Sequence, residues 1–185
     1  MTTYKIGVIV GSLRKESWSR KIANVLISLA PDTLSLHFIE IGQLSLFNQD
    51  EEFDPPKTSV EFKNKIKEID GVLFVTPEYN RSIPGVLKNA IDVASRPFGQ
   101  NAWDGKPGAV VSVSPGGPGA FGANHHLRQT FVFLNIFCMQ QPEAYIGKVT
   151  ELFDEKSNLT AESTEKFLKN FMDAFAAWVE KIVKR

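Results

Sequence analysis

A polar segment near the N-terminus gathers the side chains that proteins use to bind phosphate. Residues 11–20 read Gly-Ser-Leu-Arg-Lys-Glu-Ser-Trp-Ser-Arg and include three serine hydroxyls and two guanidinium groups. Hydroxyls donate hydrogen bonds to phosphate oxygens, and arginine contacts such oxygens bidentately. An apolar run, residues 6–10, precedes the segment, and an amphipathic run, residues 21–29, follows it. We therefore predict a phosphate site that draws on Ser12, Ser17, Ser19, Arg14 and Arg20.

The same segment also has a simpler interpretation. A strand followed by a polar loop and a helix aims free backbone N–H groups at an anion. However, Ser17 or Ser19 alone would satisfy such groups as an ordinary helix cap, with the charged side chains solvated. From this segment in isolation, the phosphate site and the cap remain equally open.

Two further segments follow apolar runs and carry unusual residues. Residues 77–82 read Pro-Glu-Tyr-Asn-Arg-Ser and offer an aromatic face at Tyr79 and an amide at Asn80. Residues 114–119 read Ser-Pro-Gly-Gly-Pro-Gly, and glycines let the backbone approach a flat ligand closely or adopt positive φ. Each segment alone is also typical of a simple turn. Their significance depends on whether the fold brings them next to residues 11–20.

Strand and helix patterns alternate along the whole chain. Strands are predicted at 6–10, 34–40, 71–76, 109–114 and 136–141, and helices at 21–29, 60–69, 84–94 and 120–135, with a closing helix whose apolar stripe runs from Phe167 to Ile182. Such alternation predicts a parallel sheet with helices on both faces. We expect residues 1–185 to form a single α/β domain, a three-layer flavodoxin-like fold with a five-stranded parallel sheet of order 2-1-3-4-5. The second strand alternates apolar and polar residues, which indicates a sheet edge.

That strand order gives the three unusual segments a common location. Strands one, three and four are neighbours in it, and ligands of such sheets bind at the carboxyl ends of the strands. Residues 11–19, 77–82 and 114–119 should therefore share one rim. A coincidence of three turn segments at one predicted site favours a ligand over three unrelated turns.

Composition excludes several classes of partner. The chain has 21 basic and 21 acidic residues, so its zero net charge gives no electrostatic basis for non-specific binding to nucleic acid or to an anionic membrane. The single cysteine, Cys138, excludes an internal disulfide, and its apolar neighbours favour a buried structural thiol over a nucleophile. We expect no metal site. The absence of a cleavable leader and of an apolar stretch of about 20 residues favours the cytoplasm.

The motifs narrow the choice of phosphate ligand. Neither the Gly-x-Gly-x-x-Gly pattern of dinucleotide sites nor the Gly-Lys-Ser/Thr of P-loops follows Gly11. A loop rich in hydroxyls that opens a helix suits a terminal monophosphate better than a pyrophosphate or a triphosphate. In a flavodoxin-like fold that ligand is FMN.

Three runs of the sequence carry a family resemblance: residues 11–19, the longer and more specific run 77–92, and the run His126-Leu127-Arg128-Gln129. In these runs the sequence resembles the NADPH-dependent FMN reductase family, in its chromate and quinone reductase branch. The resemblance spans nearly the whole chain. It implies that the first segment holds the FMN phosphate, that the turn at 77–80 lies against the isoalloxazine ring and the ribityl chain, and that the loop from Ser114 covers the pyrimidine side of the ring. The predicted cofactor-binding residues are Ser12, Leu13, Arg14, Ser17, Trp18, Ser19, Pro77, Glu78, Tyr79, Asn80, Ser114, Gly116 and Gly117.

The resemblance further implies an NAD(P)H:acceptor oxidoreductase. NADPH (or NADH) would reduce FMN, and the electrons would pass to a quinone, chromate, azo or flavin acceptor. The flavin carries the hydride, so no catalytic side chain is expected, and Glu78 is interpreted as positioning its loop. Family members form dimers or tetramers, so we expect a homodimer or homotetramer.

Two other functions remain as alternatives. A non-catalytic flavodoxin-like electron carrier would share the fold, but such carriers are usually strongly acidic and this chain is neutral. A nucleotide-sensing regulatory module would purify without flavin.

Overall fold

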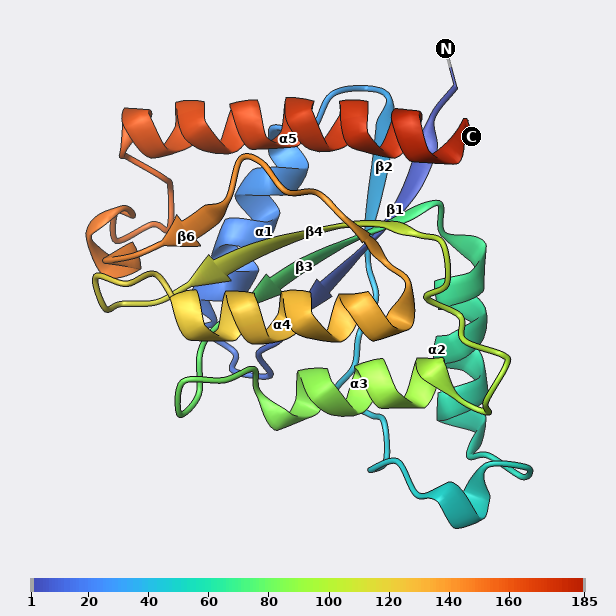
Figure 1. The fold of residues 1–185 in the computed structure, drawn as a ribbon. Helices are drawn as coiled ribbons and strands as arrows, with labels where there is room; N and C mark the ends of the chain where they lie inside the picture. The colour runs from blue at the N-terminus through green and yellow to red at the C-terminus, as the bar shows by residue number, and fades with distance from the viewer. Residues whose placement is uncertain (1, 185) are drawn as a thin grey trace.

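A parallel β-sheet forms the centre of the protein in the computed structural model, which describes residues 2–184 (Figure 1). The strands are β1 (Tyr4–Val10), β2 (Leu34–Phe38), β3 (Gly71–Thr76), β4 (Pro107–Val113), β5 (Phe137–Cys138) and β6 (Ala144–Ile146). Their order is β2-β1-β3-β4-β5, with β6 also pairing with β4, and all pairs are parallel. The predicted order 2-1-3-4-5 is therefore confirmed, with β2 at an edge.

Helices cover both faces of the sheet, which confirms the three-layer architecture (Figure 1). The helices are α1 (Trp18–Ser28), α2 (Lys57–Glu68), α3 (Gly85–Ser95), α4 (Phe121–Leu134) and α5 (Glu162–Val183), with short 3₁₀ turns η1 (Gln49–Glu51) and η2 (Val149–Glu151). One face packs on α1 and α5, and the other on α2, α3 and α4. None of the helices within residues 2–184 combines the length and the hydropathy that crossing a membrane requires.

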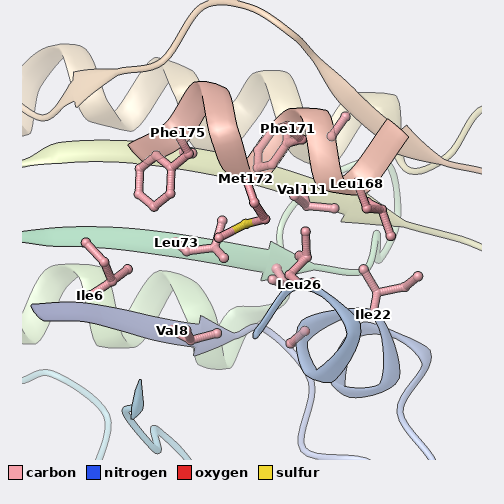
Figure 2. Close-up of a cluster of buried hydrophobic side chains, with 14 of the residues drawn as sticks. Ile6, Val8, Ile22, Leu26, Leu73, Val111, Leu168, Phe171, Met172 and Phe175 are labelled. Atoms are coloured by element: carbon pink, nitrogen blue, oxygen red, sulfur yellow. The ribbon is translucent and has the colours of Figure 1, made fainter. Parts of the chain in front are cut away.

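The apolar stripe of α5 packs into the core, as its spacing predicts. Phe171, Met172 and Phe175 have no exposed surface, and Figure 2 shows them above the sheet beside Leu73. Each such buried side chain contributes about 1.5–3 kcal/mol relative to an exposed one. The strands in the middle of the sheet are buried on both faces, so both helical layers fix the positions of their carboxyl ends.

The predicted fifth strand, 136–141, is wrong in its extent. Only Phe137–Cys138 pairs with the start of β4, and the sheet edge continues after a five-residue excursion as β6, which pairs with Val111–Val113. Pro142 lies in the excursion, and a proline cannot donate a hydrogen bond to a strand ladder. The short run 144–146 has too few residues for its apolar pattern to stand out in the sequence. Its position matters because it brings residues 145–147 to the carboxyl edge of the sheet.

Candidate functional site

The three unusual segments follow three neighbouring strands and leave the sheet at one edge. Val10 of β1 pairs with Val75 of β3, and Thr76 pairs with Ser112 of β4. The backbone N–H of Gly11 donates to the Val75 carbonyl at 2.9 Å. A Cβ on Gly11 would lie 2.7 Å from the Thr76 hydroxyl, so only glycine allows the first two segments to approach this closely. The structure thus brings the segments to one rim.

The first segment forms the capped N-terminus of α1. Ser17 is the N-cap residue, and its hydroxyl oxygen accepts a hydrogen bond from the Arg20 backbone N–H at 3.3 Å. Ser12, Ser17 and Ser19 are all buried, and no acidic side chain occupies the first turn of the helix. The cap interpretation is therefore correct for Ser17. It does not exclude an anion, because a hydroxyl that accepts one hydrogen bond still donates another.

The two arginines of the segment have different surroundings. Arg20 donates to both carboxylate oxygens of Glu40, at 2.7 and 2.8 Å, and its guanidinium lies 4.1 Å from the centre of the Phe38 ring. Arg14 is exposed, and no carboxylate within residues 2–184 forms an ion pair with it. Glu40 therefore neutralises Arg20, and Arg14 is the arginine of this segment that is available to balance an anion.

Leu13 and Trp18 offer different atoms to a ligand. The Leu13 side chain is more than half exposed and lies over the backbone of Gly42, where a Cβ would come within 3.0 Å of it. The Trp18 ring packs 5.7 Å from the Phe153 ring, and the Lys21 ammonium lies 4.5 Å from its centre. Trp18 therefore offers its backbone N–H in the first turn of α1, while its indole contributes to packing.

The second segment forms a tight turn that presents an aromatic ring. The backbone N–H groups of Tyr79 and Ser82 donate to each other's carbonyls at 2.9 and 3.0 Å. Asn80 and Arg81, between them, have φ of 52° and 63°, the two positive values of a type I′ turn. This conformation is sterically unfavourable for arginine and much less so for asparagine. Tyr79, the first residue of the turn, is 47% exposed.

Glu78 contacts a helix instead of the open rim. Its Oε2 accepts a hydrogen bond from the backbone N–H of Ala123 at 3.0 Å, in the first turn of α4. A Cβ on Gly122 would lie 2.8 Å from this oxygen and 2.8 Å from the Arg81 carbonyl oxygen. The turn is thus seated directly on the helix. Pro77 contributes its carbonyl, which accepts from the Thr76 hydroxyl at 2.9 Å.

The third segment is a compact glycine-rich loop. The Gly116 N–H donates to the Ser114 hydroxyl oxygen at 3.0 Å, and the Gly116 carbonyl accepts from the N–H groups of Gly119 and Lys148 at 3.3 Å. A Cβ on Gly147 would lie 2.4 Å from the Gly117 carbonyl oxygen, so this loop packs against the residues that follow β6. Gly117 itself has open space on the side where a side chain would stand.

A buried polar network beneath this loop was not found by sequence reasoning. The Ser112 hydroxyl donates to the Gly119 carbonyl at 2.7 Å, and Asn124 Nδ2 donates to Ser112 Oγ at 3.1 Å. Arg128 Nε in turn donates to Asn124 Oδ1 at 2.8 Å. Ser112 and Asn124 have no exposed surface. The available signal was a polar residue inside each of two apolar patterns, since buried polar groups are retained with partners.

Aromatic and histidine side chains flank the same rim. The Phe121 ring lies 4.2 Å from the His125 ring, and His125 Nε2 lies 3.0 Å from the Tyr145 hydroxyl. Burial raises the pKa of Tyr145 to about 12, with a further contribution from Glu143, so this phenol is neutral at physiological pH. The face next to the glycine-rich loop therefore carries aromatic groups suited to contact with a flat organic molecule.

A cavity away from the rim is a poorer candidate for a phosphate ligand. It has a volume of about 330 Å³, lies between the segment after β2 and helices α2 and α3, and is lined by apolar side chains such as Phe47 and by charged side chains of both signs, including Glu51 and Lys67. Its arginine, Arg96, is already paired with Glu52. Across residues 2–184, no cluster of His, Cys, Asp and Glu has an arrangement that could hold a metal ion. We therefore assign the candidate site to the rim.

The rim fits a flavin mononucleotide in two respects. Its first segment combines a helix N-terminus without an acidic side chain in its first turn, buried hydroxyls, and Arg14, which has no ion pair within residues 2–184. These groups are the donor set for a phosphate dianion. The other two segments present the Tyr79 ring and an exposed glycine backbone, which suit the face and edge of a planar ring. A ligand with a phosphate at one end and a planar ring at the other matches these two parts of the rim.

Comparisons with known proteins agree with this geometry. The family model described as NADPH-dependent FMN reductase matches residues 4–151. A quinone reductase of Pseudomonas putida is 57% identical over 178 residues, which cover 96% of this chain and 95% of the relative. A 2-hydroxy-1,4-benzoquinone reductase of a Burkholderia species is 50% identical over 175 residues, or 95% of this chain and 96% of the relative.

A solved structure supports the same relationship. The flavoenzyme FerB, an NAD(P)H:(acceptor) oxidoreductase from Paracoccus denitrificans, superposes with a TM-score of 0.91 at 44% identity, covering 97% of this chain and 99% of that one. The resemblance seen in residues 11–19 and 77–92 is thereby confirmed. The chain belongs to the NADPH-dependent FMN reductase family.

Proposed function

We propose that this protein is an FMN-dependent NAD(P)H:acceptor oxidoreductase that transfers hydride from NADPH or NADH to FMN and passes the electrons to a small-molecule acceptor. The observation that carries the proposal is the single rim at which an unpaired Arg14, the capped N-terminus of α1, the Tyr79 turn and the glycine-rich loop meet. Membership of the family and the names of the relatives support the same activity.

The residues of the rim divide into two groups by the part of the flavin they suit. We assign the phosphate to Ser12, Arg14, Ser17 and Ser19 with the backbone of Leu13 and Trp18. We assign the ring to Pro77, Tyr79, Asn80, Ser114, Gly116 and Gly117, with Glu78 holding the turn that presents Tyr79. When bound, FMN supplies the hydride chemistry. The protein supplies orientation, because the turn and the loop hold backbone groups at fixed positions on either side of the site.

Quinones are the acceptors that the relatives support most directly, since one relative is named a quinone reductase and another a hydroxybenzoquinone reductase. Chromate, azo compounds and free flavins extend the same proposal, because bound FMN would supply two-electron chemistry to acceptors that reach the rim and have a higher reduction potential. The aromatic face formed by Phe121, His125 and Tyr145 supports preference for a planar organic acceptor.

We also propose that the chain assembles as a homodimer or homotetramer. The outer face of α4 exposes Val132 and Phe133 at 85% each, which is unusual for adjacent apolar side chains on a monomer. A cytoplasmic location belongs to the same proposal, because that compartment contains the reduced pyridine nucleotide. Analytical ultracentrifugation measures the assembly, and a monomer at micromolar concentration would contradict it.

The decisive experiment combines binding and reduction. Purified protein should contain FMN or bind it from solution, and anaerobic mixing with NADPH should bleach the flavin absorbance within the stopped-flow time range. A steady-state panel of NADPH and NADH against quinone, chromate, azo and flavin acceptors then ranks the substrates.

Two results would contradict the proposal. A protein that holds FMN but stays oxidised with both pyridine nucleotides would be an electron carrier. A colourless protein that also fails to bind added FMN would be a different kind of α/β module.

A further inference from the structure

We propose that the first turn of α4 is a shared anchor that fixes the distance between the two segments on the ring side of the site, and that Glu78 and Asn124 are positioning residues acting through it. The turn at 77–82 and the loop at 114–119 follow different strands. Glu78 of the turn accepts a hydrogen bond from Ala123 of α4, and the loop is linked to the next residue, Asn124, through Ser112 of β4. The inference rests on the proposed function, because the distance matters only for a ligand held between the two segments.

Glu78 completes a helix end that lacks its own cap. The N-cap residue of α4, Ala120, has φ of 61° and no side-chain hydrogen bond, and no acidic residue lies in the first turn. The first N–H groups of a helix need acceptors, and a negative charge there is favourable. The carboxylate of Glu78 supplies both from a segment 45 residues earlier, through the Ala123 N–H. The turn that presents Tyr79 is therefore fixed relative to α4.

Asn124 fixes the other segment to the same turn of the helix. Its Nδ2 donates to Ser112 Oγ at 3.1 Å and to the Ala144 carbonyl at 3.3 Å. The Ser112 hydroxyl in turn donates a hydrogen bond to the carbonyl of Gly119, the last residue of the glycine-rich loop, and so links Asn124 to that loop. Because Ser112 and Asn124 are fully buried, water cannot replace a lost partner without rearrangement.

The two contacts reach the helix at adjacent residues, Ala123 and Asn124, so no flexible joint separates them. Gly122 is required for this arrangement, since a side chain there would collide with Glu78 and the Arg81 carbonyl. A displacement of the turn at 77–82 is thus transmitted to the loop at 114–119 through one rigid turn of helix. The distance between them is the opening available to the ring.

The test uses FMN with the apoprotein of the full chain and five variants. Glu78→Ala removes the acceptor, whereas Glu78→Gln keeps a carbonyl oxygen that still accepts from Ala123. Asn124→Ala removes the second contact. Asn170→Ala, on the exposed side of α5, is the matched control for amide removal, and thermal unfolding of each apoprotein measures stability separately.

We expect both alanine variants at the anchor to raise the FMN dissociation constant about tenfold, as loss of one hydrogen bond to a charged or buried group implies. They should also shift the midpoint potential of bound FMN, since the backbone dipoles beside the ring move. Glu78→Gln should stay within about threefold of the native protein. In the double alanine variant, the FMN dissociation constant should rise by less than the product of the two single increases. The reason is that both substitutions free the same distance between the turn and the loop.

Hydrogen exchange of the apoprotein provides a readout that needs no flavin. Glu78→Ala should speed exchange at 114–119, a loop that Glu78 does not touch, and Asn124→Ala should speed it at 77–82. Exchange confined to the mutated residue's own segment would overturn the proposal, as would reduced thermal stability with unchanged FMN affinity and potential. If the native protein binds no FMN, the proposed function fails, while the exchange data still decide whether the anchor couples the segments.

Discussion

Replacing Arg14 by alanine is the most direct test of the phosphate site. Arg14 is exposed and has no ion pair within the described part of the chain, so its removal takes no contact from the fold. A hydrogen bond to a charged group contributes about 1.5–3 kcal/mol. At 1.36 kcal/mol per factor of ten, the FMN dissociation constant should rise about 10- to 150-fold, in the lower part of that range because solvent screens an exposed guanidinium.

Arg20→Ala is the matched control, because the two arginines lie six residues apart and only one is paired. The Arg20–Glu40 pair has side chains that are 31% and 56% exposed, and such surface pairs contribute about 0–1 kcal/mol. We expect Arg20→Ala to change FMN affinity by less than about fivefold, the factor that corresponds to about 1 kcal/mol.

Fluorescence titration of each apoprotein with FMN gives the dissociation constants, and urea unfolding shows that both variants fold. Unchanged affinity in Arg14→Ala would refute the assignment of the phosphate. Equal losses in both variants would show that Arg20 exchanges Glu40 for the phosphate, and the distinction between the two arginines would be wrong.

Three further outcomes follow from single side chains. Ser17→Ala removes the N-cap of α1 and should lower the free energy of unfolding of the apoprotein by about 1 kcal/mol, measured in urea. Tyr79→Ala should change the fluorescence of bound FMN or the turnover of quinone, and no change in either would leave Tyr79 as a turn residue only. Burial raises the pKa of the Cys138 thiol, against a smaller opposing effect of Arg128, so less thiolate exists at pH 8. Its reaction with a disulfide reagent at that pH should be slower in the native protein than in urea.

The strand order was predictable because it follows from a local sequence pattern, an apolar strand followed by a helix, that recurs along the chain. Continuous apolar runs such as 71–76 are typical of strands buried on both faces, and their alternation with helices leaves few possible topologies. The stripe of α5 was equally clear, since Phe171 and Phe175 recur at helical spacing. The same reasoning located the rim, because parallel strands place their following segments on one edge.

Pairing between distant residues was not predictable from one sequence. Nothing local in the sequence indicates that Glu40 neutralises Arg20, because the contact depends on the register of β1 with β2. The link from Glu78 to Ala123 spans 45 residues and depends on how α4 packs. Asn124 could be recognised as an isolated polar residue, but its partners come from β4 and from the residues that follow β5. The division of the predicted last strand into β5 and β6 was also not predictable, since β6 has only three residues.

The glycine-rich loop tolerates a side chain at one glycine and excludes it at another. A side chain at Gly117 would meet no atom within 4 Å, whereas one at Gly119 would lie 2.6 Å from the Tyr145 backbone. Bulk can therefore be added at position 117 without repacking the loop or the sheet below it. For protein engineering, a side chain at position 117 would leave the protein's own packing intact and would compete only with the ring that we propose lies beside it.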